Sequence, residues 1–270
     1  MADTAPLVIV GTGLAGYNLA KEFRKLDNQR PMLLVSADDG RFYSKPLLST
    51  GFSKGKEADE LAMQDAAAMA AQIGAEVLTG VPVSAINPAE RTLTLGDREQ
   101  AYSDLVLALG AEVRALPWRE QLGERLLSIN DLADYGRFRA ALTGRKKVLI
   151  IGAGLIGCEF ANDLSLGGFE VTVVATDPWL MPQLLPEPVA AAVQRRLEAL
   201  GVTFHLGCGI RELAASDDAL LALLDDGSEV HADQGLSAIG LAPRTDLAAA
   251  AGLSVGRGVR VDAQLRSSDP

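Results

Sequence analysis

Two glycine-rich turns are the parts of this sequence whose residue types and spacing fit a definite chemistry. Each follows an apolar run and reads G-x-G-x-x-G. The first glycine of such a turn allows a tight bend, the second lets backbone approach a pyrophosphate, and the third lets the following helix pack closely on the strand. The start of that helix then directs unpaired N–H groups at the phosphates. The glycines are Gly11, Gly13 and Gly16 in the first turn, and Gly152, Gly154 and Gly157 in the second.

Two such turns in one chain predict two dinucleotide cofactors and therefore electron transfer between them. A single G-x-G-x-x-G run matches many sequences by chance. Here each copy has an apolar strand before it and a helical pattern after it, which is the context that the motif requires. The alternative is a pair of glycine turns in α/β units that bind nothing.

The acidic residue expected about 20 residues after each turn distinguishes the possible nucleotides. In the first half, Asp38 and Asp39 lie just beyond the second strand, where Asp38 either reaches a ribose or only forms a turn. In the second half, Ala175 stands at the strand end and Asp177 follows. No Arg or Lys occurs between residues 170 and 182, which favours NADH over NADPH because a 2′-phosphate is usually bound by Arg.

The order of elements predicts an α/β fold with two tandem, doubly wound, Rossmann-like domains. A strand at 7–10, a helix at 14–26 and a strand at 32–35 make the first half, and the pattern restarts at Lys147. Each half continues into an antiparallel excursion and then an apolar strand that ends in glycine. We expect Ala-rich helices over about 57–73. The first excursion is expected to contain strands near 76–79, 82–87, 91–95 and 99–102.

Composition excludes several classes of function. The net charge of −10 argues against nucleic-acid binding, which needs a basic face. No apolar run is long enough to span a bilayer and no leader sequence is visible, so we expect a cytoplasmic protein. The two cysteines, Cys158 and Cys208, form no C-x-x-C pair, and no spacing typical of metal ligands occurs.

Three segments together resemble the rubredoxin–NAD(+) reductases, namely Gly11–Gly16, Tyr43–Lys54 and Gly152–Leu164. These enzymes belong to the FAD/NAD(P) oxidoreductases with two dinucleotide-binding domains in a glutathione-reductase-like plan, beside the ferredoxin and putidaredoxin reductases. The resemblance runs from Pro6 to Pro270. It implies an FAD-binding domain at 1–112, a NAD-binding domain at 113–240, and a return to the first domain at 241–270.

By this resemblance, NADH gives a hydride to the flavin of FAD, and the reduced flavin passes single electrons to rubredoxin or a similar small iron–sulfur carrier. The likeness also suggests a place in alkane degradation. Lys45 would stabilise charge on the reduced ring, and Glu159 would face the nicotinamide. Local sequence by itself also fits a solvated turn at 43–50, with Ser49 or Thr50 as a helix N-cap, and Glu159 as a surface carboxylate.

The resemblance implies a set of cofactor contacts that extends beyond the glycine turns. Pro46 would border the flavin, Val83 would contact the adenine through its backbone, and small residues would line the junction of the domains. The expected cofactor-binding residues are Gly11, Thr12, Gly13, Gly16, Asp38, Lys45, Pro46, Val83, Ala108, Gly110, Gly152, Gly154, Leu155, Ile156, Gly157, Glu159, Gly240 and Pro243.

One departure concerns the end of the sequence. In this family, an Ala-x-Gly-Asp segment that contacts FAD and an interface domain follow the strands near 259–268, whereas this sequence stops at Pro270. We therefore expect a truncated form with weakened FAD retention. Alternative functions are a ferredoxin-type reductase, for which Lys45, Lys54 and Lys56 would form a modest basic patch, and a non-catalytic dinucleotide-binding protein. The oligomeric state stays open.

Overall fold

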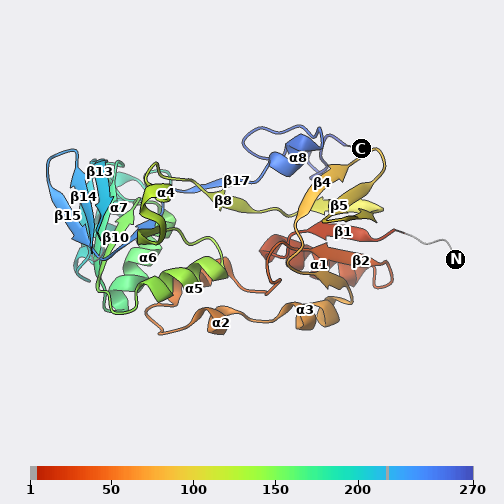
Figure 1. Cartoon of the computed structure of the whole chain (residues 1–270), viewed down its shortest axis with the longest axis horizontal. Helices are drawn as coiled ribbons and strands as arrows, with labels where there is room; N and C mark the ends of the chain where they lie inside the picture. The colour runs from red at the N-terminus through yellow and green to blue at the C-terminus, as the bar shows by residue number, and fades with distance from the viewer. Residues whose placement is uncertain (1–4, 217–218, 270) are drawn as a thin grey trace. The chain divides into compact units, whose positions relative to one another are not determined.

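The computed structural model of the chain describes residues 5–216 and 219–269. The chain forms two compact units, which are considered separately here (Figure 1). Unit 1 comprises Met1–Ser44, Ala62–Glu112 and Ala242–Pro270. Unit 2 comprises Lys45–Leu61 and Val113–Leu241.

These units differ from the predicted domains mainly in one segment. The predicted breaks after residues 112 and 240 lie at or beside the observed ones. The segment Lys45–Leu61, expected in the first domain, groups with unit 2. The reason is a set of hydrogen bonds and ring contacts to unit 2, described below.

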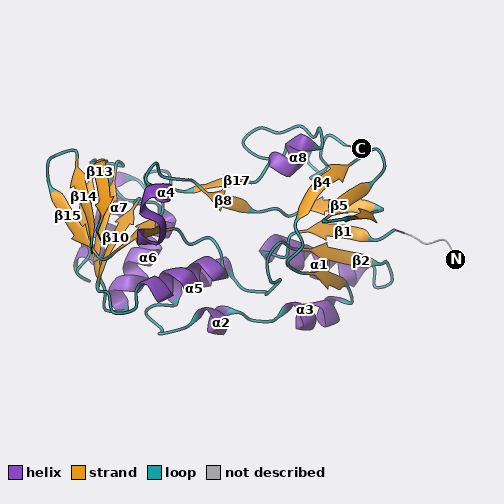
Figure 2. Ribbon diagram, in the orientation of Figure 1, coloured by secondary structure: helices purple, strands orange, loops and turns teal. Residues whose placement is uncertain are grey.

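Unit 1 is built on a four-stranded parallel sheet in the order β3-β2-β1-β7. A separate antiparallel sheet has the order β4-β5-β6 (Figure 2). The parallel strands are β1 (Leu7–Val10), β2 (Met32–Val35), β3 (Glu76–Leu78) and β7 (Asp104–Leu107). The antiparallel strands are β4 (Val83–Asn87), β5 (Thr92–Leu95) and β6 (Arg98–Ala101). The helices of this unit are α1 (Leu14–Leu26), α3 (Ala66–Ile73) and α8 (Asp246–Ala250).

The parallel sheet of unit 1 has a hydrophobic cluster on each face, which makes three layers. On one face Ile9 and Leu34 pack with Tyr17 of α1 and with α3. On the other, alternate residues of the same strands, such as Val8, pack with Leu93 of β5. The strands read as continuous apolar runs because both faces are covered. This confirms the Rossmann-like, three-layer prediction.

Unit 2 repeats the plan with a five-stranded parallel sheet in the order β12-β11-β10-β16-β9 and an antiparallel sheet in the order β13-β14-β15. The parallel strands are β9 (Leu126–Leu127), β10 (Lys147–Ile151), β11 (Glu170–Ala175), β12 (Thr203–Leu206) and β16 (Gln234–Ser237). The antiparallel strands are β13 (Ile210–Ala215), β14 (Leu220–Leu224) and β15 (Glu229–Ala232). Two short strands, β8 (Ala111–Val113) and β17 (Leu241–Pro243), pair with each other.

The longest helices of unit 2 are α5 (Leu132–Ala141), α6 (Leu155–Leu166) and α7 (Glu187–Glu198). The shorter ones are η1 (Lys45–Thr50), α2 (Ala58–Leu61), α4 (Arg119–Leu122) and η2 (Gly123–Arg125). Buried side chains of β10 and β11 pack against the antiparallel sheet on one face. Among the described residues, no helix has both the length and the apolar composition needed to cross a membrane.

One local prediction was wrong. The strand at 76–79 was expected in the antiparallel excursion, but β3 pairs in parallel with β2 and extends the main sheet. The helices expected over 57–73 are α2 and α3, which lie in different units. Asp65 ends the connection between them and caps α3 by accepting a hydrogen bond from the Ala68 N–H at 2.7 Å.

The glycine turns of the two units have nearly the same geometry. Gly11 and Gly152 have φ values of 112° and 113°, which only glycine adopts without strain. A Cβ added at Gly16 would lie 1.9 Å from the Gly11 carbonyl oxygen, and one at Gly157 would lie 2.1 Å from that of Gly152. The third glycine is therefore required because the helix starts in contact with the turn.

The segment Lys45–Leu61 is tied to α6 by a buried carboxylate. Asp163, only 1% exposed, accepts hydrogen bonds from the backbone N–H groups of Phe52 and Ser53, both at 2.9 Å, and from the Ser53 hydroxyl at 2.5 Å. The Phe52 ring packs against Tyr135, with ring centroids 5.1 Å apart. These contacts explain why the segment belongs to unit 2.

The two glycines on either side of the α6 start should respond differently to alanine. Gly157→Ala should lower the free energy of unfolding by about 1–3 kcal/mol, since the new methyl overlaps backbone that has little room to move. Gly154→Ala is the matched control, because its φ of −72° is ordinary and no atom lies within 4 Å of an added Cβ. It should cost less than about 1 kcal/mol. Equal losses in urea denaturation would contradict this account.

Candidate functional site

The first glycine turn leaves the start of α1 open for an anion. Gly13 is the N-cap of this helix and makes no side-chain capping bond. No atom lies within 4 Å of a Cβ added at Gly13. No side chain caps the N–H groups of the first turn, so a phosphate there would meet backbone donors. Gly11, Gly13 and Gly16 thus have the arrangement that the motif predicts.

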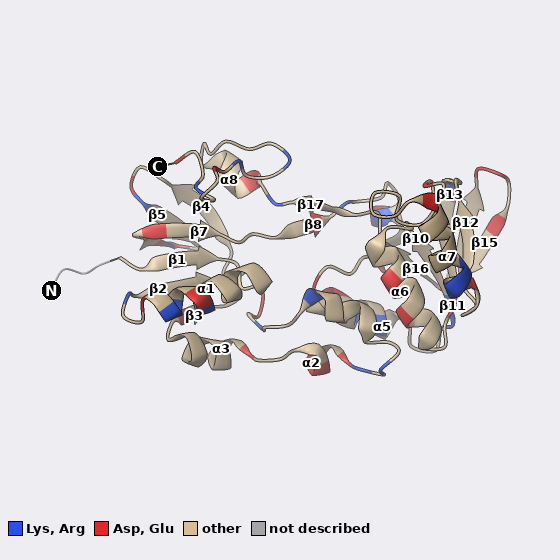
Figure 3. Cartoon of the chain, turned by 180° about the vertical axis from the view of Figure 1, so that it is seen from behind, with Lys and Arg blue, Asp and Glu red and all other residues tan. Residues whose placement is uncertain are grey.

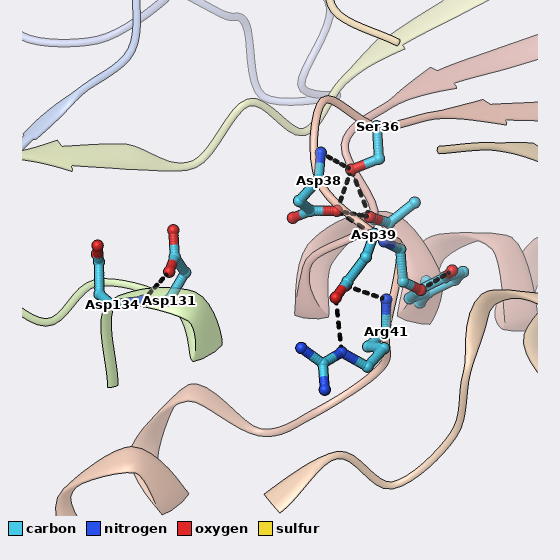
Figure 4. A network of polar contacts seen from close by, with 9 residues as sticks. Ser36, Asp38, Asp39, Arg41, Asp131 and Asp134 are labelled. Carbon is cyan, nitrogen blue, oxygen red and sulfur yellow. Dashed lines mark hydrogen bonds and ion pairs between the residues drawn. The ribbon is translucent and has the colours of Figure 1, made fainter. Parts of the chain in front are cut away.

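A polar network lies beside this turn at the end of β2 (Figure 4). The Ser36 hydroxyl donates to Asp38 Oδ1, and the Thr12 hydroxyl lies 2.8 Å from Ser36 Oγ. Asp38 Oδ1 also accepts the Gly40 N–H at 2.9 Å. Asp39 has a different partner, since its carboxylate accepts from Arg41 Nε at 2.7 Å. Asp38 is therefore the carboxylate that stands next to the first glycine turn.

The geometry around Asp38 combines the two interpretations of this residue. Its Oδ1 forms the turn, whereas Oδ2 accepts no hydrogen bond from the described part of the chain. An exposed carboxylate oxygen in this position fits a ribose hydroxyl. Tyr17 fixes this turn, because its phenol donates to the Gly40 carbonyl at 2.6 Å. Burial, followed by the nearby Asp38 and Asp39 charges, raises the pKa of Tyr17 to about 12, which keeps this donor protonated.

The second glycine turn repeats the open helix start. Gly154 is the N-cap of α6 without a side-chain capping bond, and a Cβ there would meet nothing within 4 Å. Leu155 and Ile156, the first residues of the helix, are 50% and 36% exposed. The turn is supported by Met181, whose backbone N–H donates to the Ala153 carbonyl at 2.9 Å.

The end of β11 carries no positive charge for a 2′-phosphate. Ala175 is buried at the strand end, and Asp177 is half-buried two residues later. The Asp177 carbonyl accepts the Gly207 N–H at 2.8 Å, which fixes its backbone. The carboxylate near the strand end fits a ribose with a free 2′-hydroxyl better than a phosphorylated one.

Helix α6 carries two carboxylates one turn apart on the same face, Glu159 and Asp163. It has no basic residue, as its ribbon in Figure 3 shows. The Ser49 hydroxyl donates to Glu159 Oε2 at 2.8 Å. Ser49 is 8% exposed, so this hydrogen bond is largely shielded from water. The interpretation of Ser49 or Thr50 as a helix N-cap is wrong, because both residues lie inside η1 and their hydroxyls donate hydrogen bonds.

The predicted pair Lys45 and Glu159 lies in unit 2, but the two side chains have different partners. The Lys45 ammonium donates to Asn130 Oδ1 at 3.0 Å, across a sequence separation of 85 residues. Glu159 accepts from Ser49. Pro46 is the exposed neighbour of Lys45 in η1. Sequence reasoning missed Asn130, Ser49 and Asp163 as partners, because no local signal connects them to this segment.

The remaining predicted contacts divide between the units. Ala108 and Gly110 follow β7, and the Ala108 carbonyl oxygen lies 2.3 Å from a Cβ added at Gly11, so this approach also requires glycine. Gly240 has a φ of 102° and accepts the Arg114 N–H at 3.1 Å. Unit 1 holds Gly11, Thr12, Gly13, Gly16, Asp38, Val83, Ala108, Gly110 and Pro243. Unit 2 holds Lys45, Pro46, Gly152, Gly154, Leu155, Ile156, Gly157, Glu159 and Gly240.

Neither cysteine is placed for disulfide chemistry. Cys158 is buried in α6, and its thiol lies 3.4 Å from the Ala153 carbonyl oxygen. Burial, followed by the charge of Glu159, raises the pKa of Cys158 from 9.0 to about 11, so the thiol stays protonated at neutral pH. Cys208 lies elsewhere, beyond β12, and both cysteines are unpaired.

Comparison with known proteins agrees with this geometry. Residues 5–270 match the pyridine nucleotide-disulphide oxidoreductase family. The chain is 51% identical over 264 residues to a rubredoxin-NAD(+) reductase of Alcanivorax borkumensis, covering 97% of this chain and 69% of the relative. A rubredoxin-NAD(+) reductase of Acinetobacter baylyi is 40% identical over 271 residues, with the same coverage.

A solved structure shows the same fold. The reductase in a covalent putidaredoxin reductase–putidaredoxin complex superimposes with a TM-score of 0.88 at 29% identity, covering 98% of this chain and 66% of that one. The chain thus spans about two thirds of the length of these proteins. The match over almost the whole sequence, together with two glycine turns of equal geometry, shows that this chain belongs to the pyridine nucleotide-disulphide oxidoreductase family.

Proposed function

We propose that the chain is an NADH-dependent flavoprotein reductase that passes electrons from NADH through FAD to rubredoxin. The observation that carries this proposal is the pair of open helix starts at Gly13 and Gly154, one in each unit. Two dinucleotide sites are needed where one nucleotide reduces another. The named relatives supply the identity of the acceptor, rubredoxin.

Unit 1 fits FAD and unit 2 fits NADH. In unit 1, the Gly11–Gly16 turn would hold the pyrophosphate and Asp38 Oδ2 would accept from a ribose hydroxyl. In unit 2, the Gly152–Gly157 turn would hold the other pyrophosphate, and the absence of Lys or Arg from 170 to 182 favours NADH. Bound FAD would supply the change from two-electron to one-electron transfer. The use of NADH fits a location in the cytoplasm.

In this reaction the protein's own residues would position the two cofactors and tune the potential of the flavin. Lys45 and Pro46 would border the flavin ring, with Asn130 holding the Lys45 ammonium at 3.0 Å. Glu159 would present its carboxylate to the nicotinamide. Val83, Ala108, Gly110, Gly240 and Pro243 would line the remaining cofactor contacts. This role needs no acid–base triad.

A ferredoxin-type acceptor is the second candidate. The putidaredoxin reductase complex, with its TM-score of 0.88, favours an iron–sulfur protein of that type as an alternative to rubredoxin. Lys45, Lys54 and Lys56 lie on one segment and would attract an acidic carrier in spite of the net charge of −10.

The proposal predicts that the chain, supplied with FAD, oxidises NADH and reduces rubredoxin. The loss of colour of oxidised rubredoxin measures the reaction. Gly154→Ala should weaken NADH binding, because its methyl would occupy the space expected for the pyrophosphate. Faster reduction of a ferredoxin under the same conditions would favour the second candidate. A chain that binds NADH but leaves added FAD oxidised would instead be a non-catalytic nucleotide-binding protein.

Lys45→Ala should lower the midpoint potential of bound flavin. A positive charge beside the ring stabilises the reduced, anionic form more than the oxidised form. Lys54→Ala, a lysine of the same segment whose ammonium lies 3.4 Å from Thr50 Oγ1, is the matched control and should leave the potential unchanged. Spectroelectrochemistry measures both variants. If Lys45→Ala leaves the midpoint potential unchanged, Lys45 does not lie beside the flavin ring.

Cys158→Ala should retain NADH-driven electron transfer, unlike a change to the active cysteine of a disulfide reductase. Mass spectrometry after iodoacetamide treatment near neutral pH should find Cys158 unlabelled in the folded protein. The folded thiol has the higher pKa, so its contribution to stability is present below pH 9.0 and is lost as the pH rises towards about 11. The variant should lack this part of the alkaline destabilisation. Rapid labelling together with lost activity would indicate a redox-active thiol.

A further inference from the structure

We propose that Ser49 is a positioning residue that holds the Glu159 carboxylate toward the nicotinamide carboxamide of NADH. This inference rests on the proposed function and assigns a residue outside the glycine turns to the recognition of NADH. Its basis is the hydrogen bond of 2.8 Å from Ser49 Oγ to Glu159 Oε2 within unit 2.

The Ser49 hydroxyl has one proton and two acceptors within reach. Glu159 Oε2 lies at 2.8 Å and the Pro46 carbonyl oxygen at 3.1 Å. The carboxylate is both nearer and charged, and hydrogen bonds to ionised acceptors are shorter and stronger than bonds to neutral ones. The geometry therefore favours donation to Glu159, whereas donation to Pro46 would give Ser49 only a local structural role.

Glu159 needs such a partner because its position on α6 does not fix its carboxylate. The residue lies in the second turn of the helix, is half-buried, and has a long side chain with several rotamers. With Oε2 held by Ser49, Oε1 has a defined direction. A carboxylate oxygen only accepts hydrogen bonds, and the nicotinamide carboxamide offers an NH₂ donor.

The position of Ser49 is itself fixed by the second carboxylate of α6. Asp163, one turn after Glu159, accepts the N–H groups of Phe52 and Ser53, both at 2.9 Å. These bonds place the end of η1 against α6. The buried Asp163 carboxylate, which accepts three hydrogen bonds, thereby keeps Ser49 close to Glu159. Asp163 of α6 therefore holds the segment Lys45–Leu61 in place, and Ser49 of that segment orients Glu159 of α6.

The test is a double-mutant cycle on nucleotide binding, measured by calorimetry on the FAD-supplied chain. The ligands are 1,4,5,6-tetrahydro-NAD, which has the carboxamide but no transferable hydride, and ADP-ribose, which lacks the nicotinamide. Ser49→Ala should weaken tetrahydro-NAD binding about tenfold, the scale of one charge-assisted hydrogen bond, and leave ADP-ribose binding within about twofold. In a Glu159→Ala background, Ser49→Ala should have no further effect.

The matched control is Thr50→Ala, which removes the neighbouring hydroxyl of η1 that donates to Leu47 O at 3.0 Å. It should leave both ligands unaffected. Ser49→Cys, close in volume but a weak donor, should behave as Ser49→Ala does and serves if the alanine variant does not fold.

Several results would overturn the proposal. Equal weakening of both ligands, or an effect of Ser49→Ala that persists without Glu159, would make Ser49 a structural residue acting through Pro46. Unchanged tetrahydro-NAD binding in the Ser49→Ala variant would show that Ser49 has no part in recognising the nicotinamide. If the unaltered chain binds ADP-ribose but not tetrahydro-NAD, or binds neither, the NADH site of the proposed function fails and this role fails with it.

Discussion

The contact between each helix start and the turn before it is the constraint on which both units depend. A methyl group at Gly16 or Gly157 would lie about 2 Å from a carbonyl oxygen of its own turn, at 1.9 Å and 2.1 Å. This close contact packs the helix against the parallel sheet and also directs its unpaired N–H groups toward the position expected for a phosphate. The lack of a side chain at the third glycine therefore allows both the packing of the helix and the anion site. The middle glycine is different, since a Cβ added at Gly13 or Gly154 would meet no atom within 4 Å and would crowd a bound phosphate rather than the fold.

Helix α6 shows how one element can serve binding and assembly together. Its start faces the expected pyrophosphate, and its second and third turns carry Glu159 and Asp163. Asp163 is buried and its charge is balanced by three donors from the segment after η1. A buried carboxylate without such donors would be strongly destabilising. The segment that carries Lys45 is therefore a part of the unit that contains α6, although the sequence places it in the other half of the chain.

The family name includes disulfide chemistry, but the cysteines of this chain do not support it. Cys158 is held protonated by its apolar surroundings and by Glu159, and Cys208 lies on a different element. A reduced flavin can pass its electrons onward singly without a thiol relay. This agrees with the relatives named as rubredoxin reductases.

Local sequence by itself determined the glycine turns, the parallel strands beside them, and the three-layer plan of each unit. These features follow from spacing of a few residues: apolar runs, a glycine at a positive φ, and a helix start. Only the tertiary structure decided that β3 joins the main sheet and that Lys45–Leu61 belongs to unit 2. It alone showed that Ser49 bonds to Glu159 and Lys45 to Asn130. Those bonds join residues 110 and 85 positions apart, and a periodic pattern cannot reveal which distant side chains meet once the helices have packed.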